Sequence, residues 1–455
     1  MSLPRYPEYK DSGVDWLGAV PGHWEVKRLR FVAELNPSKS EIAELDKETP
    51  VSFLPMDAIG DDGKINLEYE KRIADVETGY TFFRDGDVTV AKITPCFENG
   101  KGAVMQGLTQ GIGFGTTELI VARPIVSQTC SDYLHALFTS VEFRNNGEGY
   151  MYGAGGQKRV PDDFVRNFAI AFPPLEEQQT IAAFLDCETG KIDALIAEQQ
   201  RLAELLAEKR QAVISLAVTK GLNPNARMKD SGIAWLGEVP KHWEVVPLKQ
   251  VISQIESGVS VNASDFPATE PEPGVLKTSC VYSGQFDANE NKTVIEAEIE
   301  RVSCPLKAGT LIVSRMNTPE LVGAAGLVKV APENIYLPDR LWQVSFTNAV
   351  PAFVHYWTQS VFYRAQIRVV CAGTSSSMQN LGQDQFRTFD FPNPPQEEQQ
   401  TITAFLDSET AKFDTLAAEA NRVIKLLQER RSALISAAVT GKIDVRSIST
   451  IKEAA

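Results

Sequence analysis

The chain carries an internal repeat of about 220 residues, and this repeat constrains the fold more than any other feature of the sequence. Residues 10–26 (KDSGVDWLGAVPGHWEV) return as residues 229–245 (KDSGIAWLGEVPKHWEV), with 13 of 17 positions identical. Residues 176–195 return as residues 397–416, with 15 of 20 positions identical. The offsets are 219 and 221 residues, so the intervening stretches differ in length by only two. Because the period is far longer than a solenoid repeat, it predicts a duplicated domain.

The sequence between the repeated blocks diverges, although some similarity remains. Residues 86–95 resemble residues 309–319 with one insertion, and Lys92 aligns with Arg315. We therefore expect the two variable regions to share one fold and to present different surfaces. Nearly identical blocks around divergent regions predict two domains that share a scaffold and recognise different targets.

Each second block begins a long helix. Apolar residues recur at steps of four and three from position 181 to 216, and again from 402 to 437, as in the seam of a coiled coil. Prolines precede each helix, glutamates follow them at the positive end of the helix dipole, and Gly221 and Gly441 mark the expected ends. The predicted seam positions are Ile181, Leu185, Ile192, Leu195, Leu202 and Leu206 in the first copy, and Ile402, Leu406, Phe413, Leu416, Val423 and Leu427 in the second.

Two such seams in one chain, separated by a domain, pair most simply with each other. An antiparallel pair of helices, each about 60 Å long, brings the two ends of the chain together. The alternative is a set of long core helices that do not form a coiled coil. The predicted boundaries are residues 1–175 for the first domain, 176–221 for the first helix, 222–396 for the second domain, 397–441 for the second helix and 442–455 for a C-terminal tail.

Composition narrows the class of protein. The sequence contains no run of about 18 apolar residues, and its N-terminal residues lack the basic start and apolar stretch of a secretory signal. The six cysteines are scattered without a CxxC pair, which argues against a disulfide framework and a zinc ribbon. We therefore expect reduced thiols and a cytoplasmic location.

The net charge of −14 is unlike that of a basic protein that coats DNA. DNA binding by this chain therefore requires that its basic residues be concentrated on one surface.

Sequence signatures of catalysis are absent or weak. There is no GxxxxGK[ST] phosphate loop, and the glycines at 111–115 lack the context of a dinucleotide-binding motif. Residues 393–396 (NPPQ) resemble the Asn-Pro-Pro-aromatic tetrapeptide of amino-methyltransferases, but Gln396 replaces the aromatic residue that stacks on a flipped base. The histidines and cysteines show no metal-ligand spacing. The sequence therefore predicts no catalytic, metal or cofactor site in this chain.

Each frame block carries two tryptophans, Trp16 and Trp24 in the first copy and Trp235 and Trp243 in the second. Aromatic side chains can stack on nucleic-acid bases. Because both copies keep these residues while the presumed reading surfaces differ, we interpret them as packing residues.

Two zones in each copy offer cations for phosphates and amide or guanidinium groups for base edges. The first zone follows a strand-like segment, and the second is a polar, glycine-rich loop before each helix (152–164 and 371–386). The alternative is that both zones are ordinary surface loops. The candidate DNA-binding residues are Lys92, Thr94, Asn99 and Lys101 with Gln157, Lys158 and Arg159 in the first copy, and Arg315, Asn317 and Thr318 with Ser375, Gln379 and Asn380 in the second.

The alternation of variable domain and helix resembles the specificity subunit of type I restriction–modification systems. The stretches ITPCFENGKG (93–102), GFGTTELIVARP (113–124) and FPPLEEQQTIAAFLD (172–186) resemble its hallmark segments, and the likeness covers nearly all of residues 1–445. It implies an α+β fold, with two similar α/β target-recognition domains separated by two long helices in an antiparallel coiled coil.

The resemblance also implies a function. Each recognition domain reads one half of a bipartite double-stranded DNA target, and the helices set the spacing and dock two modification (methyltransferase) subunits. Those subunits methylate adenine with S-adenosylmethionine, and added restriction/translocase subunits use ATP and Mg, so this chain itself is non-catalytic and binds no cofactor. The alternatives are the recognition subunit of another methylation-based defence complex, a stand-alone DNA methyltransferase or nuclease, and a scaffold that does not bind DNA.

Overall fold

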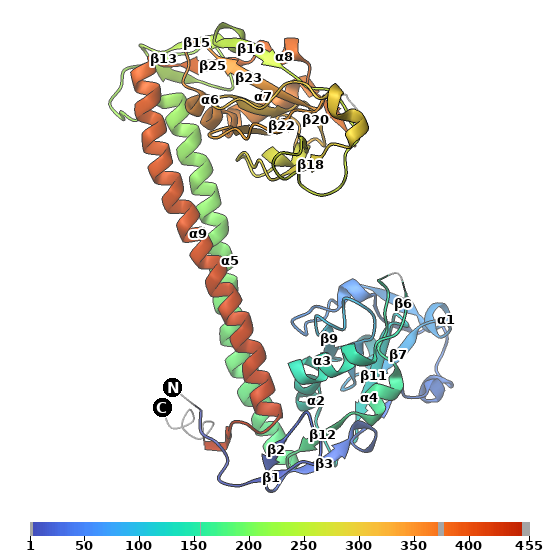
Figure 1. The fold of residues 1–455 in the computed structure, drawn as a ribbon. Coiled ribbons are helices and arrows are strands. Elements are labelled where there is room, and N and C mark those ends of the chain that lie inside the picture. Colours follow the sequence, from blue (N-terminus) through green and yellow to red (C-terminus); the bar gives the residue numbers. More distant parts are fainter. Residues whose placement is uncertain (1–2, 155, 372–376, 448–455) are drawn as a thin grey trace. The chain divides into compact units, whose positions relative to one another are not determined.

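The computed structural model describes residues 3–154, 156–371 and 377–447 (Figure 1). The chain divides into two units. Unit 1 comprises Met1–Gln200 and Arg422–Ala455, and unit 2 comprises Arg201–Asn421. The two long helices, α5 (Leu175–Lys220) and α9 (Gln396–Val439), therefore each contribute one half to each unit.

Unit 1 is built on two four-stranded sheets. The first is antiparallel with strand order β4-β11-β8-β9, and the second has order β6-β5-β10-β7, in which β5 and β10 run parallel. Its short elements are β1 (Tyr9–Asp11), β2 (Ala19–Pro21), β3 (Glu25–Arg28), β4 (Ala33–Leu35), β5 (Pro50–Leu54), β6 (Glu70–Arg72), α1 (Ile73–Val76), β7 (Thr81–Arg84), β8 (Val88–Ala91), β9 (Gly102–Val104), β10 (Ile112–Gly115), β11 (Leu119–Pro124), α2 (Ser131–Thr139), α3 (Val141–Tyr150), α4 (Asp162–Asn167) and β12 (Ala169–Phe172).

Unit 2 repeats this plan with a smaller second sheet, whose three strands have the order β18-β17-β22. Its four-stranded antiparallel sheet has the order β16-β23-β19-β21, and β17 pairs in parallel with β22 as β5 does with β10. Its short elements are β13 (Met228–Asp230), β14 (Glu238–Pro240), β15 (Glu244–Pro247), β16 (Ile252–Glu256), β17 (Gly274–Leu276), β18 (Asn291–Thr293), β19 (Leu311–Ser314), β20 (Met316–Asn317), β21 (Ala325–Leu327), β22 (Ile335–Tyr336), β23 (Leu341–Phe346), α6 (Pro351–Thr358), α7 (Val361–Cys371), β24 (Gln379–Asn380), α8 (Gln383–Arg387) and β25 (Asp390–Asn393). The two variable regions thus share one fold.

The central strands are buried on both faces because their side chains alternate between two cores. In β11, Ile120 and Ala122 face the core that contains α2 and the helix ends, whereas Leu119 and Val121 face a second, smaller core. A strand buried on both sides needs a continuous apolar run rather than alternation, which is what LIVA at 119–122 provides.

In each unit the halves of α5 and α9 run antiparallel and side by side (Figure 1). In unit 1, Ile181 and Leu185 share a core with Ile435 and Val439, and farther along the pair Arg431 binds Asp193, with an Nε–Oδ1 distance of 2.9 Å. The antiparallel pairing predicted from the sequence is therefore confirmed in this unit.

The corresponding contacts in unit 2 give the same direction. Ile214 and Val218 share a core with Ile402, and Arg210 Nε lies 3.3 Å from Asp414 Oδ1.

Within the described residues, no helix is long and apolar enough to cross a membrane.

Burial along the two helices differs from the predicted seam at three positions. Leu195, Leu202 and Leu416 are 46%, 43% and 53% exposed, so they do not form a continuous buried stripe as expected. A straight helix drifts by about 20° per heptad from a strict 3.5-residue repeat, and a pair of helices covers only a narrow stripe of each. The predicted positions Ile181, Leu185, Ile192, Leu206, Ile402, Leu406 and Phe413 are buried, while Val423 and Leu427 are half-buried.

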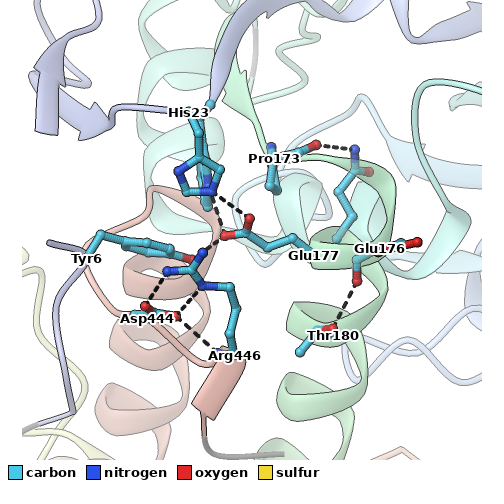
Figure 2. Close-up of polar contacts among 10 residues, drawn as sticks. Tyr6, His23, Pro173, Glu176, Glu177, Thr180, Asp444 and Arg446 are labelled. Atoms are coloured by element: carbon cyan, nitrogen blue, oxygen red, sulfur yellow. Dashed lines mark hydrogen bonds and ion pairs between the residues drawn. The ribbon is translucent and has the colours of Figure 1, made fainter. Parts of the chain in front are cut away.

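The first turn of α5 is tied to the frame block by the carboxylate of Glu177. The hydroxyl of Tyr6 donates to Glu177 Oε1 at 2.7 Å, and His23 Nε2 lies 2.7 Å from Oε2 (Figure 2). The indole N–H of Trp24 also donates to Glu177 Oε1, at 3.1 Å. Arg446 packs over the ring of Tyr6. Burial and the neighbouring Glu177 carboxylate raise the pKa of Tyr6. We call Tyr6, His23, Trp24 and Glu177 the Glu177 cluster.

The second copy keeps only part of this arrangement. His242 Nε2 lies 2.8 Å from Glu398 Oε2, but the indole N–H of Trp243 is buried without a partner within the described chain. Asn225 stands where Tyr6 stands in the first copy. Trp24 and Trp243 are fully buried and Trp16 and Trp235 are half-buried, which agrees with the interpretation of the frame tryptophans as packing residues.

Candidate DNA interface

In unit 1 the two predicted zones lie together. Residues 92–101 leave the end of β8, and the glycine-rich loop follows α3. Ile93 and Arg159 form an antiparallel bridge, and the amide of Thr94 donates to the carbonyl of Lys158 at 3.0 Å. The amide of Lys158 in turn donates to Thr94 Oγ1 at 3.0 Å. Two segments about 60 residues apart in sequence thus form one surface.

Unit 2 joins its two zones in the same way. β20 pairs with β24, with Met316 opposite Asn380 and Asn317 opposite Gln379. The amide of Leu381 donates to the carbonyl of Arg315 at 2.8 Å, as the amide of Val160 donates to Lys92 in unit 1. This register makes Lys92 equivalent to Arg315.

A third segment, which the sequence analysis missed, completes each surface. Glu118 directly precedes β11, and its carbonyl accepts from the amide of Lys92 at 2.8 Å. Arg340 directly precedes β23, and its carbonyl accepts from the amide of Arg315 at 3.0 Å. The only sequence signal was the place of both residues immediately before an apolar strand, because the cross-strand register is a tertiary property. We call these three segments the variable face of each unit. The variable face of unit 1 comprises residues 92–99, 118 and 157–159, and that of unit 2 comprises residues 315–318, 340 and 379–380.

Charge is arranged differently on the two variable faces. In unit 1, Arg159 binds Glu118 through Nε and Nη2 at 2.8–3.2 Å, with side chains 38% and 25% exposed. The hydrogen bonds from Arg159, together with its charge and that of Lys92, lower the pKa of Glu118. In unit 2, Asn380 occupies the place of Arg159 and Arg340 that of Glu118.

Most predicted DNA-binding residues lie on these surfaces and are accessible. Ser375 lies outside the described residues. The exposed ones are Asn99, Gln157, Lys158, Thr318 and Asn380, and the half-buried ones are Lys92, Thr94, Arg159, Arg315 and Gln379.

Two predicted residues are instead engaged in the interior. The side chain of Lys101 is 17% exposed, and its Nζ donates to the carbonyl of Met56 at 3.1 Å. Asn317 is 6% exposed, and its Nδ2 donates to Tyr282 Oη and Ser314 Oγ. Their polar groups already have partners, so the expectation that they reach DNA is corrected to a role in holding the loops.

Two histidines, one in each unit, contact backbone carbonyls. His135 on α2 is half-buried and His355 on α6 is buried. Their Nε2 atoms lie 3.2 Å from the carbonyl oxygen of Gly102 and 2.7 Å from that of Gly284, respectively. Burial lowers the pKa of both, that of His355 to about 4. In the part of the chain that the structure describes, no three His, Cys, Asp or Glu side chains are grouped to hold a metal ion.

Comparison with known proteins agrees with this architecture. The family described as the type I restriction modification DNA specificity domain matches residues 21–206 and 240–426, one match in each copy of the repeat. The type I restriction enzyme EcoEI specificity subunit of Escherichia coli is 29% identical over 459 residues, covering 83% of this chain and 76% of the relative. The EcoAI specificity subunit of Escherichia coli is 39% identical over 267 residues, which cover 57% of this chain and 44% of the relative.

Two solved structures have a similar fold. One comes from a study of complex assembly and conformational transition in the type I R-M system, with a TM-score of 0.68, 19% identity, and 92% of this chain and 98% of that chain covered. The other is the HsdS subunit from Thermoanaerobacter tengcongensis, with a TM-score of 0.52, 19% identity, and 93% and 98% covered. The duplicated family match, the two equivalent variable faces and the paired long helices lead to one conclusion: this chain belongs to the family of type I restriction–modification specificity subunits.

Proposed function

We propose that each unit of this specificity subunit reads one half of a bipartite DNA sequence, and that partner subunits carry out the chemistry. The observation that carries the proposal is the pair of variable faces. Both units build the same three-segment ladder, and each places different polar side chains on it. A common scaffold with different reading groups is what recognition of two different half-sites requires.

The charge of these surfaces supports DNA as the ligand. The chain as a whole has a net charge of −14. The variable face of unit 1 nevertheless carries Lys92, Lys158 and Arg159 against the two carboxylates of Glu98 and Glu118, and that of unit 2 carries Arg315 and Arg340 without a carboxylate. Local cations of this kind can hold phosphates even on an acidic protein.

The partners follow from the proposed role. Two modification subunits dock on the helices and methylate adenine with S-adenosylmethionine, and restriction/translocase subunits add ATP- and Mg-dependent cleavage, so this chain supplies no catalytic group and binds no cofactor. Leu195, Leu202 and Leu416 are exposed on the helices, so these apolar side chains are accessible to a docked partner subunit. The six scattered cysteines, among which there is no CxxC pair, support a reducing, cytoplasmic location.

The test is genome-wide mapping of methylated adenines in cells with this chain and its partner subunits, compared with cells that lack the chain. We expect one asymmetric, interrupted motif that depends on the chain. Exchange of residues 31–171 for those of a relative should change one half of the motif only. Methylation by the purified chain alone, or an exchange that alters both halves, would contradict the proposal.

A further inference from the structure

One position on the variable face reverses its charge between the two units. The residue directly opposite Lys92 is Glu118, and the residue directly opposite Arg315 is Arg340, joined by equivalent backbone hydrogen bonds of 2.8 and 3.0 Å. The flanking strands β8 and β11 in unit 1, and β19 and β23 in unit 2, pair in the same register. The scaffold is therefore constant, and the side chain alone differs.

The arrangement in unit 2 is electrostatically unfavourable without a ligand. Like charges directly opposite each other destabilise a β-ladder, and Arg315 and Arg340 are such a pair. Neither arginine makes a side-chain hydrogen bond or ion pair within residues 3–154, 156–371 and 377–447, and the Nε of Arg315 is buried without a partner. Two unpartnered guanidinium groups at one place are suited to a ligand that offers several hydrogen-bond acceptors.

The comparison of the two units distinguishes a base from a phosphate at this position. Every half-site offers the same phosphates, so a phosphate contact calls for a cation in both units. Lys92 and Arg315 meet that condition. Position 118 in unit 1 does not, because a carboxylate repels phosphate.

A carboxylate at a DNA surface can instead accept from the amino group of cytosine, and an arginine can donate to O6 and N7 of guanine. In unit 1 both groups are present side by side. The ion pair with Glu118 uses Nε and Nη2 of Arg159, which leaves Nη1 to donate elsewhere. Together, the Glu118 carboxylate and the Arg159 guanidinium group are complementary to the cytosine amino group and to the guanine O6 and N7 atoms that a single C·G pair presents in the major groove.

We propose that positions 118 and 340 are the equivalent base-reading positions of the two units: Glu118, with Arg159, reads a C·G pair in the half-site of unit 1, and Arg340 reads a guanine in the half-site of unit 2. This inference rests on the proposed function. It assigns sequence specificity to two residues outside the zones that the sequence singled out. The opposite residues, Lys92 and Arg315, then contact the backbone and position the DNA.

The experiment maps methylated adenines produced by the full chain with its partner subunits, comparing wild type with Glu118→Ala and Arg340→Ala. In Glu118→Ala one C·G pair in the half-site of unit 1 should become degenerate, with a roughly 5- to 150-fold loss of preference, while the other half-site stays unchanged. Arg340→Ala should relax one guanine in the half-site of unit 2 only. By contrast, Lys92→Ala should reduce methylation at all sites alike and leave the motif unchanged.

Matched controls are available in both units. Glu48 forms an exposed ion pair with Arg72 in unit 1, and the exposed Arg301 pairs with the half-buried Glu298 in unit 2, both outside the variable faces. Glu48→Ala and Arg301→Ala should leave the motif and the extent of methylation as in the wild type. If the alanine variants fail to fold, Glu118→Gln and Arg340→Lys replace them. Glu118→Gln removes the charge at nearly constant size, and Arg340→Lys removes the bidentate fork.

Each outcome decides the inference. Degeneracy confined to one base pair of the matching half-site supports it. An unchanged motif, or a uniform loss of methylation from a folded complex, overturns it, because these results indicate no contact or a phosphate contact. A wild-type chain that produces no bipartite motif would instead contradict the proposed function, and a wild-type bipartite motif beside unchanged variants contradicts only this inference.

Discussion

Removal of the carboxylate of Glu177 should destabilise unit 1 by far more than the same change at its repeat counterpart destabilises unit 2. In Glu177→Ala, the hydroxyl of Tyr6 and the indole N–H of Trp24 lose their acceptor while remaining in residues that are 4% and 0% exposed. A buried polar group left without a partner costs about 1–3 kcal/mol. The two groups together give an expected loss of roughly 2–6 kcal/mol in the free energy of unfolding.

Glu398→Ala is the matched control that the duplication provides. Among the described residues, His242 is the only side chain that pairs with Glu398, and both are partly exposed, so their pair contributes about 1 kcal/mol or less. The indole N–H of Trp243 is already without a partner, so the variant leaves no new group unsatisfied. Both glutamates lie in the first turn of a long helix, so the helix-dipole contribution cancels in the comparison.

Native-state hydrogen exchange read by mass spectrometry measures the two effects separately, because it reports the local opening free energy of each peptide. We expect faster exchange in peptides around Trp24 and the start of α5 for Glu177→Ala, and little change around Trp243 for Glu398→Ala. Tyr6→Phe should cost less in the Glu177→Ala background than in the wild type, since the two residues act as a pair. An equal effect of the two glutamate variants would refute the assignment of stability to the buried hydrogen bonds.

The remaining predictions concern the helices and a buried histidine. Insertion of a four-residue turn near Leu202–Leu206, in register with the heptads, lengthens a helix by about 6 Å. Methylation mapping should then show a spacer changed by roughly two base pairs, with both half-sites intact. An unchanged spacer would contradict the role of the helices in setting the spacing. Leu206→Ala should lower the free energy of unfolding by about 2 kcal/mol or more, and Leu202→Ala by about 0.5 kcal/mol or less, because Leu206 is 9% and Leu202 43% exposed; equal losses in urea denaturation would refute this reading of the seam. Burial lowers the folded-state pKa of His355 to about 4, so below about pH 6.5 the unfolded chain binds a proton that the folded chain does not. The free energy of unfolding should therefore fall by at most about 3 kcal/mol as the pH drops from about 6.5 towards 4. His355→Gln should flatten this part of the plot of urea midpoint against pH.

The sequence predicted the elements of the fold that depend on local pattern. The repeated blocks predicted two similar domains, and the apolar steps from Ile181 and Ile402 predicted the long helices and their antiparallel pairing. The prolines and the glycines at 221 and 441 lie beside the helix ends that the structure shows at Lys220 and Val439. Each of these features depends on residues that are close together in the sequence or that recur in both copies of the repeat.

What the sequence could not supply is the register between strands. The same apolar strands that were visible at 119–122 and 341–344 bring Glu118 and Arg340 opposite Lys92 and Arg315, but only once the sheet has formed. For the same reason Asn317 looked like an accessible reading group. Its burial against Tyr282 depends on a loop 35 residues away.

The division of the helices between the units makes unit 1 discontinuous in sequence. Its core includes Ile435, Ala438, Val439 and Val445 beside residues from the first 200, whereas unit 2 is one continuous stretch. At synthesis rates of about 5–20 residues per second, the earlier part of unit 1 leaves the ribosome roughly 10–50 s before the segment that completes its core. The domain that is made first is therefore finished last, and during that interval the apolar start of α5 has no permanent partner from α9.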